Sequence, residues 1–268
     1  EDLMVSDRLF ALDTETGRLL WVHTGEKIAN VTVALGEGQI FFADSAITTE
    51  QRSQALAQRQ TRIQSGVYRE RHGVVEELKE KKLLLAKYLD QKKSLVEAQL
   101  DHRQLDGLIT QVEYLVASLQ SELFEEEVDA GTLSRAEADV RRVVALDARS
   151  GKKVWERPVD LTGCGGDKMG AAYRDDLLLF FGNHGNHDAW RFREGGMKWR
   201  RITALAATTG EMVWSRPLNY RTRPVIVGEK IILEPQACEL RTGATVMREH
   251  PITGQQVPWE FLRPGHTC

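Results

Sequence analysis

The sequence contains no run of about 18 apolar residues, and its first residues lack the basic and apolar segments of a signal peptide. Its three cysteines, Cys164, Cys238 and Cys268, form no C-x-x-C pair, which excludes a zinc knuckle and a covalently attached haem. Neither sign of charge dominates, since 36 Lys and Arg against 39 Asp and Glu give a net charge of −3. The chain therefore has no overall field that would attract nucleic acid or an anionic membrane. Its 268 residues, 41% of them hydrophobic, are enough for a sizeable core.

Proline and tryptophan are both missing from one long segment. All seven prolines lie between Pro158 and Pro264, and all six tryptophans lie outside residues 45–142, which are rich in Glu, Lys, Arg, Gln and Leu. The change in composition predicts three parts: residues 1–44, a helical insertion at 45–142, and residues 143–268.

An eleven-residue pattern, A-x-D-x-x-T-G-x-x-x-W, recurs in the two flanking parts. It occupies residues 11–21 and 145–155, a third copy at 204–214 has Ala in place of Asp, and a fourth at 237–247 has Met in place of Trp. Each copy is typical of a β-hairpin, because the Thr/Ser-Gly pair supplies a turn residue that accepts a positive φ. Strand-like runs before each copy give about four strands per unit, and such units in tandem are typical of propeller blades. The repeated positions are Asp13, Gly17, Trp21, Asp147, Gly151, Trp155, Gly210, Trp214 and Gly243.

This pattern resembles the tryptophan-docking motif of the pyrroloquinoline-quinone-like (PQQ-like) repeat. The repeat is found in quinoprotein alcohol dehydrogenases and in the non-catalytic outer-membrane assembly lipoprotein of Gram-negative bacteria. The resemblance implies an all-β fold, a partial β-propeller of about four blades built from four-stranded antiparallel sheets. It also implies that Trp21, Trp155 and Trp214 are structural and pack on the turn of a neighbouring blade.

The blade number bears on how much of the propeller this chain contains. Propellers of the family usually have seven or eight blades, so we expect this chain to be a fragment of a longer bacterial protein. The remaining blades of that protein would be partners of this part. The resemblance also implies a periplasmic or other extracytoplasmic location.

Residues 45–142 carry helical patterns. An N-cap signal at Thr48-Thr49-Glu50 predicts a first helix to about Gln64, and apolar spacing predicts a second from about Val74 to Gln104. We expect a break near Asp106-Gly107 and then a third helix, so that the last two form a coiled-coil-like antiparallel hairpin. Two interpretations stay open, an arm that docks a protein partner or dimerises, and a self-packed, solvated spacer. The mixed charge argues against nucleic acid as a partner.

One polar loop is the main candidate for ligand contact. It follows the apolar strand 177–181, at a strand end where propellers place ligands. The ligand-facing candidates are Asn183, His184, Asn186, His187 and Asp188, and of these His184, His187 and Asp188 are the metal candidates. The four residues from Gly185 match the G-N-H-D of metallophosphoesterases, but no D-x-H or G-D-x-x-D motif accompanies them.

Other polar residues give weaker signals, and no residue is assigned to catalysis. The single Cys164 does not match the adjacent cysteine pair of quinoprotein alcohol dehydrogenases. We interpret a second group, around Tyr220, as surface and turn charges: Arg201, Arg216, Arg221 and Arg223.

Two classes of function remain from the sequence. The preferred one is a non-catalytic interaction or scaffold module of an exported bacterial protein. The alternative is a fragment of a PQQ-dependent quinoprotein alcohol dehydrogenase-type oxidoreductase, in which PQQ and calcium would lie on the propeller axis.

Overall fold

The computed structural model describes residues 4–64, 71–129, 138–182, 200–217, 220, 223–233, 236–252, 254 and 256–259. The strands before the helical segment are β1 (Val5–Leu12), β2 (Leu19–Ala29), β3 (Ala34–Gly36) and β4 (Gln39–Asp44). Those that follow it are β5 (Val140–Asp147), β6 (Lys153–Asp160), β7 (Met169–Arg174), β8 (Leu177–Gly182), β9 (Arg201–Ala206) and β10 (Met212–Pro217). The last are β11 (Val225–Val227), β12 (Lys230–Ile232), β13 (Ala237–Glu239), β14 (Met247–Glu249) and β15 (Gln256–Pro258).

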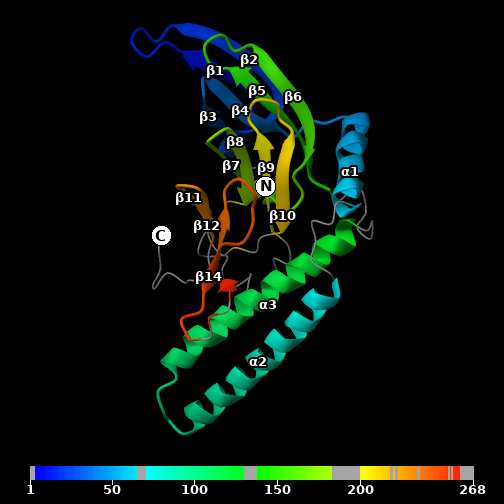
Figure 1. Cartoon of the computed structure of the whole chain (residues 1–268). Coiled ribbons are helices and arrows are strands. Elements are labelled where there is room, and N and C mark those ends of the chain that lie inside the picture. Colours follow the sequence, from blue (N-terminus) through cyan, green and yellow to red (C-terminus); the bar gives the residue numbers. More distant parts are fainter. Residues whose placement is uncertain are drawn as a thin grey trace.

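The strands pair antiparallel, mostly in chain order (Figure 1). β7 to β10 form a four-stranded sheet, and β3 to β6 pair in the same order. The β1–β2 hairpin joins the latter through one residue pair, Ile28 with Asp44, which makes a six-stranded sheet. β11 to β13 form a three-stranded sheet, and β14 and β15 form a hairpin. This mostly β architecture is consistent with a partial β-propeller.

β5 and β8 are buried on both faces, and because side chains of a strand alternate in direction, neighbouring residues belong to different cores. On β8, Leu178 and Phe180 belong to a core shared with the β3–β6 strands, whereas Leu179 and Phe181 belong to a core shared with β11–β13. On β5, Val143 and Val144 divide in the same way between two cores. Burial on both faces explains why the runs at 177–181 and 143–146 are continuously apolar.

The connections differ between the two ends of the strands. At one end, called here the turn face, the links are the short turns at 13–18, 37–38, 148–152, 175–176, 207–211 and 228–229. Hydrogen bonds between turns confirm that they share this end, as from the Ala148 N–H to the Gly38 carbonyl and from the Ala207 N–H to the Asp176 carbonyl. At the other end, the loop face, β4, β6 and β8 end at Asp44, Asp160 and Gly182, and β5, β7 and β9 begin at Val140, Met169 and Arg201.

Three α-helices leave the loop face: α1 (Thr49–Gln64), α2 (Arg71–Glu97) and α3 (Arg103–Asp129). They lie between β4 and β5, whose register places Asp44 opposite Arg142. Thr48 caps α1, since its Oγ accepts from the Gln51 N–H while the Gln51 side chain accepts from the Thr48 N–H. α1 packs beside β5 and β6, α3 contacts α1 and β10, and α2 packs on α3 (Figure 1).

The break between α2 and α3 is not where the sequence analysis put it. α2 ends at Glu97, and the turn at residues 98–102 contains Gln99 with a φ of +57°. The carboxylate of Asp101 accepts from the Arg103 N–H and so starts α3. Gly107 lies inside α3 with open space around its Cα, so the expected break at Asp106-Gly107 is wrong. A glycine on an exposed helix face costs only about 1 kcal/mol, which a long helix tolerates.

A fifth turn of the repeat type was missed by the sequence analysis. The Gly254 N–H bonds the His250 carbonyl at 2.9 Å and Gly254 has a φ of +69°, close to the values at the other repeat turns. The turn joins β14 to β15. Its signal in the sequence is weak, because His replaces the initial Asp and no Trp stands four residues after the glycine.

Candidate functional site

Trp21, on β2, lies against the turn of the next repeat hairpin, β5–β6. Its indole Nε1–H donates to the Ala148 carbonyl at 3.0 Å. A Cβ on Gly151 would come within 2.6 Å of the indole ring, so only glycine leaves room for this contact. The φ of Gly151 is +68°, which also favours glycine. Both the space needed by the indole and the positive φ therefore require glycine at position 151 of the repeat.

The same contact recurs twice. Its donor, carbonyl acceptor and glycine are Trp155, Ala207 and Gly210 in one case, and Trp214, Leu240 and Gly243 in the other. The N–H···O distances are 2.8 and 3.0 Å, and a Cβ would lie 2.6 and 2.7 Å from the indole. Each indole thus joins one hairpin to the turn of the next, on the turn face of the molecule.

An arginine two residues after the tryptophan adds a second bond to two of these turns. The Nε–H of Arg157 donates to the Thr209 carbonyl at 2.6 Å, and the Nη1–H of Arg216 donates to the Gly243 carbonyl at 3.0 Å. The sequence analysis did not single out these arginines as a set, although the spacing Trp-x-Arg occurs in both copies. The docking unit is therefore a strand that delivers an indole and a guanidinium together.

Aspartates at the start of two turns hold the turn backbone. The Asp13 carboxylate accepts from the N–H and hydroxyl of Thr16 at 2.8 and 2.6 Å, and Asp147 accepts from those of Ser150, both at 2.7 Å. The side-chain bond is the largest cause that lowers the pKa of each carboxyl below its ordinary value of 3.8. These bonds stay within each turn, so the aspartates shape the turn that receives the indole.

The polar loop of the sequence analysis lies outside the described residues. That holds for all its candidates: Asn183, His184, Asn186, His187 and Asp188. Gly182, at the end of β8, is described, and its N–H donates to the Tyr220 hydroxyl at 2.6 Å. Within the described ranges, no group of three or more His, Cys, Asp or Glu side chains is arranged to hold a metal ion.

Two arginines beside this position are buried, which corrects the interpretation of Arg201 as a surface charge. Arg200 and Arg201 are 1% and 0% exposed, and Tyr220 is fully buried with them. An N–H of Arg200 donates to the Tyr220 carbonyl, and its guanidinium lies 5.4 Å from the centre of the Tyr220 ring. The charge of Arg predicted exposure because an ionised side chain is rarely buried without partners. Arg200 is buried together with its hydrogen-bond acceptor, the Tyr220 carbonyl, and with the Tyr220 ring.

The described cysteines are not placed for reactivity. Cys164 and Cys238 are both fully buried, and burial raises the pKa of each thiol to about 12. Cys164 lies beside Thr203, with 3.4 Å between the sulfur and the hydroxyl oxygen. Both thiols are neutral at physiological pH and pack as small apolar groups.

The base of the helical insertion is held by Asp44, which is 1% exposed. Its carboxylate accepts from the N–H groups of Glu26, Lys27 and Ala46 and from Arg142, at 2.9 to 3.0 Å. Burial alone would raise the pKa of Asp44, but these four donors outweigh it and hold the pKa below 3.8. The carboxylate therefore fixes the point where the chain leaves β4 for the helices.

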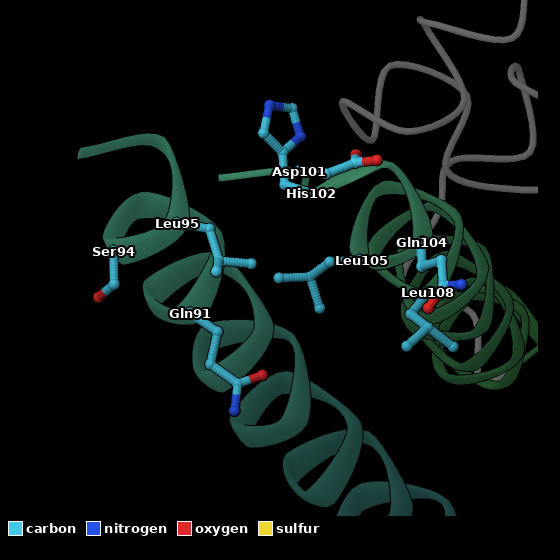
Figure 2. A pocket seen from close by; sticks show the side chains of 8 residues that line it. All are labelled: Gln91, Ser94, Leu95, Asp101, His102, Gln104, Leu105 and Leu108. Atoms are coloured by element: carbon cyan, nitrogen blue, oxygen red, sulfur yellow. The ribbon is translucent and has the colours of Figure 1, made fainter. Parts of the chain in front are cut away.

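The far end of the α2–α3 hairpin carries a pocket of about 750 Å³. Figure 2 shows Leu95 and Leu105 pointing toward one another from the two helices, with polar side chains around them. Beside it, Lys92 and His102 contact the Asp106 carboxylate, at 2.6 and 2.9 Å. The pocket is lined by Gln91, Ser94, Leu95, Asp101, His102, Gln104, Leu105 and Leu108.

The two long helices differ in exposure. On α3, four apolar side chains at three- and four-residue spacing are buried: Ile109, Val112, Val116 and Leu119. α3 lies against α1 and β10 as well as α2, so it is the inner helix of the pair. On α2, Val75, Leu89 and Val96 are 39 to 51% exposed, and their spacing in multiples of seven puts them on one side. α2 is the outer helix, and the exposed Lys82 holds the heptad position between Val75 and Leu89 on this side.

No protein-family model and no curated protein matches this sequence. Among solved structures, the chain is similar to BamB from Moraxella catarrhalis, with 19% identity and a TM-score of 0.27 over 42% of this chain and 34% of that chain. It is also similar to a europium-containing methanol dehydrogenase, with 18% identity and a TM-score of 0.26 over 41% of this chain and 21% of that one. The matches span well under two thirds of either neighbour.

A helix that spans a membrane needs about 20 consecutive, mostly apolar residues, and this requirement can be applied to the described helices. None of them combines the length and the apolar character needed to cross a bilayer.

Proposed function

We propose that this chain is part of a PQQ-like β-propeller, about four blades in extent, that serves as a non-catalytic interaction or scaffold module. It works in an exported bacterial protein, in the periplasm, and the α2–α3 hairpin is its contact with a protein partner. One observation supports this most directly: the outer helix α2 keeps Val75, Leu89 and Val96 exposed on one side. Apolar side chains that stay exposed on one side of a helix are available for contact with another protein.

The way the hairpin is mounted fits a contact role. Asp44 and Arg142 fix its base to the sheet, and α3 packs on α1 and β10, so α2 is held in a defined direction. A rigid mounting lowers the entropic cost of binding, because the contact surface is already ordered before the partner arrives. At the tip, the pocket between Leu95 and Leu105 offers a recess that is lined by both apolar and polar side chains.

Quinone binding separates this proposal from the oxidoreductase alternative. The full-length protein is titrated with pyrroloquinoline quinone and calcium, and quinone absorbance and dye-linked alcohol oxidation are followed. We expect neither saturable binding nor turnover. Saturable binding with turnover would make the chain part of an enzyme, in which the quinone accepts the substrate hydride.

The contact role of the hairpin is tested by changing its outer side. We expect Leu89→Glu with Val96→Glu to abolish partner binding by the full-length protein, whereas the exposed charge swap Lys87→Glu with Asp90→Lys should leave it intact. Light scattering with and without residues 45–141 then identifies the partner class. The Asp44–Arg142 pairing allows a two-residue Asn-Gly turn to close the gap. A fall to one chain per particle shows a second copy as partner, and an unchanged number of chains per particle removes the idea that the hairpin dimerises.

A further inference from the structure

The exposed surface of α2 is divided into a basic side and an acidic side. On the basic side, two adjacent heptad positions carry exposed lysines between exposed apolar residues. We call this set the lysine stripe, and its members are Val75, Lys79, Lys82, Leu89, Lys93 and Val96. The heptad positions next to the stripe carry the exposed carboxylates Glu76, Glu80, Asp90 and Glu97. Charge of one sign is therefore gathered along one side of the helix.

The lysines of the stripe have no partner of opposite charge within the described part of the chain. Lys81 and Lys92 of α2 do form ion pairs, with Glu80 and Asp106, but both lie outside the stripe. The stripe runs over residues 75–96, about 30 Å at 1.5 Å per residue. It therefore presents a row of available cations beside apolar side chains over the length of a short helix.

A second copy of α2 does not complement this stripe. In an antiparallel pair centred on the exposed Ala86, Lys79 of one copy would lie beside Lys93 of the other. In a parallel pair, each lysine would lie beside its own counterpart. Like charges placed together in an interface oppose association. The stripe therefore favours a different partner, one that carries carboxylates.

An anionic lipid surface also fits the stripe poorly. A helix that lies in a membrane interface has a continuous apolar side in the lipid and lysines on the opposite side. Here Lys82 interrupts the apolar residues between Val75 and Leu89, and anionic headgroups would repel Glu76 and Asp90 beside the stripe. The alternation of lysine and apolar residues instead matches a helix in which acidic and apolar side chains alternate at the same spacing.

We propose that the lysine stripe binds an acidic amphipathic helix of another protein. Its carboxylates pair with Lys79, Lys82 and Lys93, and its apolar side chains lie on Val75, Leu89 and Val96. Such a helix can lie along α2 without meeting the sheets, because α3 lies between α2 and the sheets (Figure 1). This inference rests on the proposed contact role of the hairpin and names the chemistry of the partner.

The test uses the full chain and two synthetic peptides. The acidic peptide is three copies of Leu-Ala-Gln-Glu-Ala-Gln-Ala, which places Leu and Glu alternately on one side of a helix, and the basic peptide has Lys in place of Glu. Binding is measured by the fluorescence anisotropy of the labelled peptide. We expect saturable binding of the acidic peptide at low salt, at least tenfold weaker at about 0.5 M salt because exposed charges are then screened. The basic peptide should show no saturable binding.

Matched variants locate the binding on the chain. Lys79→Glu with Lys93→Glu reverses two charges of the stripe, so we expect the acidic peptide to bind at least tenfold more weakly and the basic peptide to bind. The control, Lys87→Glu with Lys152→Glu, makes the same change in net charge at exposed lysines outside the stripe and should bind as the unaltered chain does. Lys and Glu have similar helix propensities, so both variants should keep the helical circular dichroism of the unaltered chain.

Three outcomes would overturn the inference. They are no binding of the acidic peptide by the unaltered chain, equal binding by the stripe variant and the control, and binding to phosphatidylglycerol vesicles without binding to the acidic peptide. The contact role itself is tested separately, by partner binding in Leu89→Glu with Val96→Glu. Loss of partner binding in that variant, with full binding in Lys79→Glu with Lys93→Glu, would keep the contact role and reject an acidic partner.

Discussion

Replacing glycine by alanine at six turns separates the contribution of indole docking from that of turn geometry. All six glycines have a positive φ, between +56° and +74°. In three of them a Cβ would meet an indole, and in three it would meet nothing within 4 Å. The first group is Gly151, Gly210 and Gly243, and the second is Gly17, Gly38 and Gly228.

The expected losses in the free energy of unfolding follow from these contacts. Every variant carries the strain of alanine at positive φ, about 1–2 kcal/mol. In the first group the methyl group also lies within 2.7 Å of a ring atom, and overpacking of this kind costs about 1–3 kcal/mol more. Displacement of the indole weakens its bond to the carbonyl, which contributes about 1 kcal/mol. The two groups should therefore differ by about 2–4 kcal/mol in the free energy of unfolding.

Urea denaturation followed by tryptophan fluorescence and by circular dichroism measures this difference. The fluorescence of the native state should also shift to longer wavelength in the first group, because the displaced indole meets water. Equal losses of stability in all six variants would refute the reasoning, since backbone strain would then account for the whole effect.

Four further outcomes are expected. Arg142→Met should lower the free energy of unfolding by about 3 kcal/mol at pH 7, because it leaves the buried Asp44 carboxylate without its cation. Since the folded-state pKa of Asp44 is lowered, its stabilising contribution is present above pH 3.8 and is lost as the pH falls through the folded value. In Asp44→Asn, the free energy of unfolding measured with urea should therefore depend less on pH between pH 5 and about pH 2. Gln99→Gly should raise the thermal midpoint slightly, because it removes about 1 kcal/mol of backbone strain at a φ of +57° in an exposed turn. A lower midpoint would contradict this. Cys164 and Cys238 should escape thiol reagents at pH 8 until urea unfolds the chain, as peptide mass mapping would show.

The sheets could largely be predicted from the sequence because their signals are local. The Thr/Ser-Gly pair of each turn and the continuously apolar runs at 143–146 and 177–181 need no distant information to be interpreted. The strands on either side of the helical segment pair directly with one another, from Gln39 with Asp147 to Asp44 with Arg142.

Other features depend on contacts that no local pattern contains. The end of α2 is set by the cap at Asp101 and the turn at Gln99, whereas Asp106-Gly107 offered a stronger helix-breaking signal. The burial of Arg201 depends on the position of β9 between two cores, and its charge alone pointed to the surface. The openness of the Gly17 turn could be found only by comparing it with three occupied turns.

The contrast between the turn face and the loop face bears on where this chain can accept foreign sequence. Each tight turn with an indole on it is constrained from two sides, so an added residue there would disturb a neighbouring sheet as well as its own. On the opposite side, the ladder already closes at Asp44 and Arg142 whatever the intervening segment contains. A reporter domain or a different helical hairpin whose ends lie close together should therefore replace the present helices with β4 and β5 still paired, although the packing of α1 on β5 and β6 would be lost. The fold separates the residues that maintain it from the segment that can diversify.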